Sequence, residues 1–263
     1  MAKKRAAVPR HSSPRKGRHR TENKDDQVLV ENSQGQISEV AALYRLMAWL
    51  SPAYPVGAFA YSSGLEWAVE AGDVTSTEKL FQWLATLLSD GMGYCDAVLF
   101  VHAYRACTAG DDKGLGEVAE LAAALAPSRE RFLETTAQGQ AFFDVTRASW
   151  PCRALDRLSR TSPGPVAYPV AVAVASAGHG ISLRQSLAAY LQALAANWVS
   201  VGVRVIPLGQ TDGQRVTAML EPSVAAIVKR ALGSALDDVG GAVFRADIAA
   251  MRHETQYTRL FRS

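Results

Sequence analysis

The strongest constraint in this sequence is a helical spacing of apolar residues that begins near Ser38 and continues to the end of the chain. Between Leu43 and Leu50 the apolar residues fall on one face of a helix. Pro52 ends this helix because proline disfavours α geometry in the residue before it. Period-two alternation between hairpin turns, the mark of a strand, is not found. The chain is therefore expected to be all-α, with a single bundle-like body.

The same spacing predicts where the other helices lie. They are expected at about 65–71, 77–107, 115–126, 128–150, 166–178, 182–205 and 214–232, with a terminal helix after Gly240-Gly241. Gly91 and Gly93 mark a break or a close helix crossing inside 77–107. The Val-rich run VSVGVRVIPL resembles a strand, but it directly follows a helical stretch, so we expect it to continue that helix.

Loops are predicted where proline and glycine gather. These segments are 51–64, 161–165 and the turn GQTDG at 209–213. None of them has the length or composition of an interdomain linker. We therefore predict one all-helical domain over residues 37–263.

Residues 1–36 are predicted to be a disordered basic arm. Residues 1–26 alone carry nine Lys or Arg against three Asp or Glu and no aromatic residue, so they have little to bury. The arm also lacks the apolar stretch of a signal peptide. A nucleic-acid tether is one interpretation of such an arm. A solvated extension is the commoner one, and we expect no nucleic-acid partner.

Membrane insertion and metal binding are not expected. The longest uninterrupted apolar run, about 166–177, is too short to span a bilayer. The three cysteines show no CxxC pair, and no two histidines of the body stand at helical metal-ligand spacing. We therefore predict a cytoplasmic protein with no metal site of its own.

Catalytic motifs are also missing, since the sequence has no GxxxxGK[ST], GxGxxG, GxSxG or HExxH segment. Cys95 and His102 share a helix face but lie two turns apart, about 10 Å, which is too far for a nucleophile and its base. Glu66 and Glu70 stand at i,i+4, as paired carboxylates could. A small all-α hydrolase using Cys95 or Glu66 therefore remains the alternative to a non-enzyme.

Side chains suited to protein–protein contacts are concentrated in two segments. The 51–64 loop carries three aromatic residues on a backbone that proline stiffens, which lowers the entropy lost on binding. The tail, residues 247–263, mixes aromatic, aliphatic and arginine side chains as an interface anchor does. Each segment has an alternative interpretation, in which the loop aromatics fold into the core and the tail packs on its own domain.

These segments resemble the urease accessory protein F (UreF) family. The loop SPAYPVGAFAYSSGLEWAVEAGDV is similar to the first signature of that family, RVIPLGQTDGQR to the second, and MRHETQYTRLFRS to the third. The three motifs occur in the family's order within about residues 40–263. Phe59 stands where some members have tyrosine, so no role that needs a hydroxyl transfers to it.

The resemblance implies an all-α, dimeric, non-catalytic chaperone of urease maturation. Such a protein bridges accessory protein D (also called H) and the GTPase accessory protein G for nickel insertion into apo-urease. Nickel and GTP are then handled by these partners and no cofactor is bound directly. Whether nickel contacts this chain stays open at this point.

The resemblance also implies roles for individual residues, with the tail becoming ordered on the D/H partner. The implied partner-binding residues are Phe59, Tyr61, Glu66, His253, Glu254, Tyr257, Arg259, Leu260 and Phe261. The implied backbone-shaping residues are Pro52, Pro55, Gly57, Gly64 and Gly213. Among these, Arg259 would be a charged anchor able to make bidentate bonds, whereas His253 and Glu254 would set helix geometry.

Overall fold

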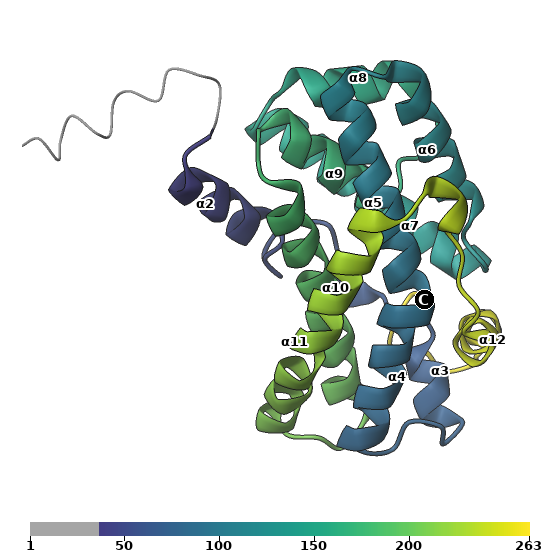
Figure 1. Ribbon diagram of the computed structural model, residues 1–263. Helices are drawn as coiled ribbons and strands as arrows, with labels where there is room; N and C mark the ends of the chain where they lie inside the picture. The colour runs from purple at the N-terminus through teal and green to yellow at the C-terminus, as the bar shows by residue number, and fades with distance from the viewer. Residues whose placement is uncertain (1–36) are drawn as a thin grey trace, which may run out of the picture. The chain divides into compact units, whose positions relative to one another are not determined.

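Helices account for all the regular structure that the computed structural model shows over the residues it describes, 37–263 (Figure 1). The α-helices are Glu39–Trp49 (α2), Leu65–Glu70 (α3), Thr77–Asp90 (α4), Met92–Ala109 (α5), Asp112–Ala124 (α6), Arg129–Ser149 (α7), Arg153–Thr161 (α8), Tyr168–Gly178 (α9), Leu183–Val205 (α10), Gln210–Gly233 (α11) and Phe244–His253 (α12). Two 3₁₀ turns, Ala58–Ala60 (η1) and Leu236–Asp238 (η2), complete the set. The all-α prediction is confirmed. The predicted arm, 1–36, lies outside the described residues.

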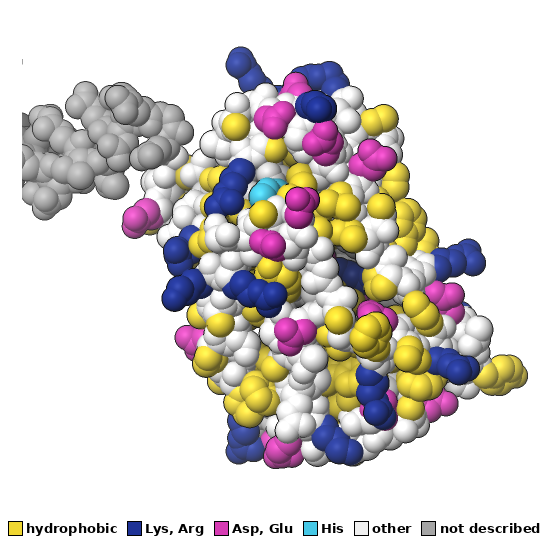
Figure 2. Space-filling view, turned by 45° about the vertical axis from the view of Figure 1, so that its right-hand side comes forward, with side chains coloured by type: hydrophobic (Ala, Val, Ile, Leu, Met, Phe, Trp, Pro, Cys, Tyr) yellow, Lys and Arg dark blue, Asp and Glu magenta, His cyan; other side chains and the backbone are white. Residues whose placement is uncertain are grey.

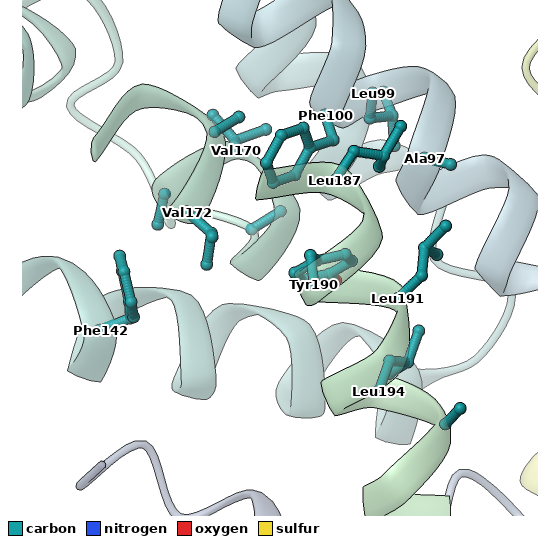
Figure 3. Packing of buried hydrophobic residues seen from close by; sticks show 14 of the residues in the cluster. Ala97, Leu99, Phe100, Phe142, Val170, Val172, Leu187, Tyr190, Leu191 and Leu194 are labelled. Atoms are coloured by element: carbon teal, nitrogen blue, oxygen red, sulfur yellow. The ribbon is translucent and has the colours of Figure 1, made fainter. Parts of the chain in front are cut away.

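The core is built around α9, whose residues from Val170 to Ala175 are all fully buried. This helix packs against α5 and α7, while α10 packs against α11. Phe100 from α5 and Tyr190 from α10 meet in this core with ring centroids 5.5 Å apart (Figure 3). Because α9 consists almost entirely of Ala and Val, its neighbours approach it closely on every side.

Several predicted elements need correction. Of the two alternatives predicted at Gly91 and Gly93, a break or a close helix crossing, the structure shows a break at Gly91, where the backbone leaves the helical region (φ −122°, ψ −143°), so 77–107 is two helices and not one stretch. The turn predicted at 209–213 is instead the first turn of α11, where the Asp212 carboxylate accepts the Gly209 N–H at 3.2 Å. Helix α8 was not predicted. The Val-rich run does continue α10, as expected.

Two helical stretches reach the length and hydropathy of a membrane span, contrary to the prediction. These are 77–109, which includes the break at Gly91, and 183–205. In the fold, 67% of the most apolar segment of the first stretch is buried, and 56% of that of the second. Core helices of a packed bundle pass the same test, and these two lie in that position.

Candidate functional site

The three sequence motifs converge at one end of the bundle. Arg204, the first residue of the second motif, donates to the Phe59 carbonyl at 3.0 Å. Its guanidinium also stacks on the ring of Phe261, 4.4 Å from the centroid. The Arg262 N–H adds a hydrogen bond to the Ala60 carbonyl at 2.7 Å. One arginine of α10 therefore ties the loop to the tail.

Glycines allow the tail and the loop to approach this closely. Gly64 has φ +80°, and a Cβ added there would lie 2.6 Å from the Ala250 backbone nitrogen in α12. Gly57 has a similar φ of +71° but faces open space. At Gly213 a Cβ would meet Val203 at 2.7 Å, where α11 crosses α10. Pro52 and Pro55 are exposed on the outer side of the loop.

The Glu66 carboxylate is a buried acceptor for the tail backbone. It accepts the Leu260 N–H at 2.7 Å and the Phe261 N–H at 3.1 Å. We expected Glu66 either to face a partner or, in the hydrolase alternative, to act as a catalytic carboxylate. Instead it binds two consecutive amides nearly two hundred residues further along the chain. Because the acceptor is a carboxylate, these two hydrogen bonds are charge-assisted and therefore strong.

His253 is fully buried between two carboxylates. Its Nε2 lies 3.0 Å from Glu66 Oε2, and its Nδ1 lies 2.8 Å from Glu130 Oε2. Only the imidazolium form donates from both nitrogens at once. Glu130 also accepts from Arg259 at 3.1 Å. Burial raises the pKa of Glu130, and the neighbouring His253 and Arg259 act against that rise.

Glu134, one helical turn after Glu130, holds the last residue. Ser63 Oγ donates to it at 2.9 Å and Ser263 Oγ at 3.3 Å. Trp198 Nε1 donates in turn to Ser63 Oγ at 2.9 Å, and both the N–H and the hydroxyl of Ser62 bond the Ser263 carbonyl. Burial raises the pKa of Glu134, with Arg131 opposing. The tail is thus bound along its length by the body.

Five large apolar side chains of α12 and of the segment after it point outward. Phe244, Ile248 and Met251 follow one side of α12 at helical spacing and are 74%, 51% and 49% exposed. Tyr257 is fully exposed and Leu260 is 75% exposed. We call these five residues the contact face. Figure 2, which turns the side of Figure 1 that carries α12 toward the viewer, shows apolar side chains interspersed with Arg and Lys there.

The predicted partner-binding residues therefore divide into two groups. Phe59, Tyr257, Arg259 and Leu260 are exposed. Tyr61, Glu66, His253 and Phe261 are buried in this chain, and Glu254 is half-buried and accepts the Arg129 N–H at 3.1 Å. The buried group fastens the tail to its own domain, and the expectation that the tail becomes ordered on the D/H partner stays a prediction. Of the loop aromatics, Tyr54 and Tyr61 fold inward.

The residues of the body that bind the tail were not predicted from the sequence. Glu130 and Glu134 on α7 bind the tail, and Arg204 on α10 links it to the loop. A signal was present for α7, since Glu130, Glu134 and Gln138 stand four residues apart and form a polar stripe on one face. A polar stripe in a helix surrounded by apolar helices indicates buried hydrogen bonding.

The hydrolase alternative finds no support in this geometry. Burial raises the pKa of the Cys95 thiol to about 11, so the nucleophilic thiolate is scarce at neutral pH. His102 Nε2 lies 3.1 Å from the Ser234 carbonyl, so it is engaged elsewhere. The Glu66 carboxylate is occupied by the tail.

Comparison with known proteins agrees with the three motifs. The UreF family model matches residues 74–221, more than half of the chain. The chain belongs to the UreF family of urease accessory proteins. UreF proteins act in urease maturation and are non-catalytic chaperones, so this chain is not an enzyme.

Curated relatives cover most of the chain at high identity. A urease accessory protein UreF of Bradyrhizobium diazoefficiens is 59% identical over 86% of this chain and 93% of its own length. One from Bradyrhizobium sp. strain BTAi1 is 61% identical over 84% and 92%. A third, from Rhodopseudomonas palustris strain HaA2, is 59% identical over 89% of this chain and its whole length.

Proposed function

We propose that this chain is the scaffold that bridges the D/H accessory protein and the G GTPase while nickel is inserted into apo-urease. The observation that carries the proposal is the contact face. Five large apolar side chains stand exposed on α12 and on a tail that buried polar groups hold in place. Several large exposed apolar groups on one firmly bound segment favour a protein-binding surface.

The anchoring explains why such a surface could bind tightly. A segment that is already fixed loses less conformational entropy when a partner arrives. Tyr257 and Leu260 would each contribute about 1.5–3 kcal/mol if the partner buried them fully. Arg259, which bonds Glu130 yet is exposed, would be the charged member of the same surface.

The division of labour in the proposed complex leaves nickel and GTP with the partners. Within residues 37–263 no group of three or more His, Cys, Asp or Glu side chains is placed to hold an ion. We also propose that the chain acts as a homodimer in the cytoplasm, as the family resemblance implies.

The test is co-purification with the D/H partner. The double variant Tyr257→Ala, Leu260→Ala removes exposed side chains only, so it should fold normally, lose the partner and fail to activate urease. Leu133→Ala, which truncates a half-exposed leucine on α7, is the matched control and should retain the complex. A double variant that still co-purifies at the wild-type level rules out the contact face as the docking site.

A further inference from the structure

Positive charge is concentrated at the end of the chain that carries the contact face. Residues 37–263 as a whole carry 19 Lys or Arg against 21 Asp or Glu, so the body is slightly acidic. The last thirteen residues instead carry three arginines and one acid, Glu254. The arginines alternate in sequence with Tyr257 and Leu260, two members of the contact face. The basic charge and the exposed apolar side chains therefore belong to the same segment.

Three arginines beside the contact face are exposed and unpaired. Arg252 stands four residues after Ile248 on α12, so it borders the apolar side of that helix. Arg262 follows Leu260 by two residues, and Arg129 begins α7. The ion pairs within residues 37–263 include none of these three guanidinium groups. A guanidinium group stays charged at any physiological pH, so three positive charges stand next to the apolar surface.

The carboxylates at this end of the molecule are bonded elsewhere. Glu254 is half-buried and accepts the Arg129 backbone N–H at 3.1 Å. Glu70 accepts the side-chain amide of Gln256. Glu130 is 5% exposed and accepts from two side chains of the tail segment. In the described part of the chain, the charges of the three arginines are therefore compensated by solvent alone.

A partner that covers the contact face also removes water from these arginines. Taking a charged group out of water is costly unless the partner brings an opposite charge to it. Carboxylates are the protein groups that match a guanidinium group, because each can accept two parallel N–H bonds from it. The surface that fits this one is therefore apolar at its centre and carries Asp or Glu side chains around that centre.

The apolar members of the contact face favour an acidic protein over other anions. Single-stranded nucleic acids are bound by aromatic stacking and phosphate contacts, whereas Ile248, Met251 and Leu260 are not aromatic. A helix that lies on an anionic membrane keeps a polar, solvated face opposite its apolar one. In α12 the opposite face is buried, through Ala246, Ala249 and other residues, against α3 and α7.

We propose that the D/H accessory protein docks on the contact face through an acidic surface. Its carboxylates pair with Arg129, Arg252 and Arg262, while its apolar side chains cover Tyr257 and Leu260. Charges at the edge of an interface act mainly on the rate of association and on the choice of partner, and less on affinity. The identity of the partner rests on the proposed function, whereas its acidity rests on the three arginines.

The test is the association rate of the full chain with immobilised D/H protein, measured by surface plasmon resonance. Raising the NaCl concentration from about 0.1 M to about 1 M shortens the screening length from about 10 Å to about 3 Å. We expect the association rate constant of the wild type to fall roughly tenfold or more over this range.

The double variant Arg252→Glu, Arg262→Glu should associate roughly tenfold or more slowly at about 0.1 M NaCl and should lose the decrease with salt. Arg153→Glu with Arg160→Glu is the matched control. It makes the same change of charge at two exposed arginines of α8, which packs on α6 and α9 away from α12 (Figure 1). The control should associate like the wild type.

A cross-linking experiment answers the same question with the positive charge kept. The double variant Arg252→Lys, Arg262→Lys places amines where a carbodiimide can join them to carboxylates in contact. Because residues 230–263 contain no lysine in the wild type, any such cross-link from this segment arises from the substitutions. We expect cross-links to Asp or Glu of the D/H protein, and none from the corresponding lysine variant of Arg153 and Arg160.

Three results would overturn the acidic surface. They are an association rate that does not fall with salt, a wild-type rate in the Arg252 and Arg262 charge reversal, and the absence of the expected cross-links. In each of these the complex still forms, so the proposed function survives. If the D/H protein does not associate at all, or if the chain is retained on phosphatidylglycerol vesicles in its place, both the proposed function and this inference are wrong.

Discussion

Single residues decide whether the tail can lie on the loop. Gly64 and Gly57 share a left-handed backbone, but only Gly64 has another helix against it. We predict that Gly57→Ala lowers the free energy of unfolding by about 1–2 kcal/mol, because alanine is strained in the left-handed conformation. Gly64→Ala should cost more, roughly 2–5 kcal/mol, because its Cβ also overlaps Ala250. Denaturant unfolding of both variants measures the difference, and equal losses would contradict the close approach.

For single residues, the sequence identifies the contact residues of the tail, but it does not show which of their side chains face the core and which face solvent. Composition marks Phe261 and Leu260 as equivalent contact residues. In the fold Phe261 is 5% exposed, under the Arg204 guanidinium, while Leu260 is 75% exposed. The chain bends at Leu260 and Phe261, and the Glu66 carboxylate fixes both of their amides, so the two neighbouring side chains differ in burial. That pairing spans the whole chain, so local sequence patterns do not contain it.

At the scale of elements, periodicity predicts helices well and their ends less well. The long apolar stretches α9 and α10 were placed nearly as found, because their patterns are strong. The start of α11 was missed, since GQTDG has the composition of a turn while Gly209 and Asp212 cap a helix with it. The association of α12 with α3 and α7 depends on buried charges, which no periodicity reports.

The attachment of the tail to the body is testable at this scale. We predict that Glu66→Ala frees the segment after α12, because it removes two charge-assisted bonds of about 1.5–3 kcal/mol each. Hydrogen exchange at the Leu260 and Phe261 amides should then accelerate strongly while that of α9 stays unchanged. Glu70→Ala, one turn along the same helix, removes only a contact with Gln256 and serves as the control. Equal protection of both amides in the two variants would show that Glu66 does not hold the tail.

For the whole molecule, the interior acids link stability to pH. Burial raises the pKa of Glu130, Glu134 and Asp247, and for Asp247 burial is the only resolved cause. An acid with a raised pKa binds more protons in the folded state than in the unfolded state, so unfolding free energy falls as pH rises. For Asp247 this stabilisation is complete below its ordinary value of 3.8 and is lost as pH rises through the raised value.

We therefore predict that Asp247→Asn flattens the pH profile of stability. Asparagine keeps the shape of the side chain but has no charge to desolvate, so the variant should gain stability relative to the wild type as pH rises from 4 toward neutrality. Thermal unfolding across that range measures the slope. Asp237→Asn, at an exposed carboxylate, controls for the loss of one charge and should leave the slope as in the wild type. Identical slopes in the two variants would mean that Asp247 is not the source of the pH dependence of stability. The carboxylate would then be less buried than the contacts of α12 with α3 and α7 indicate.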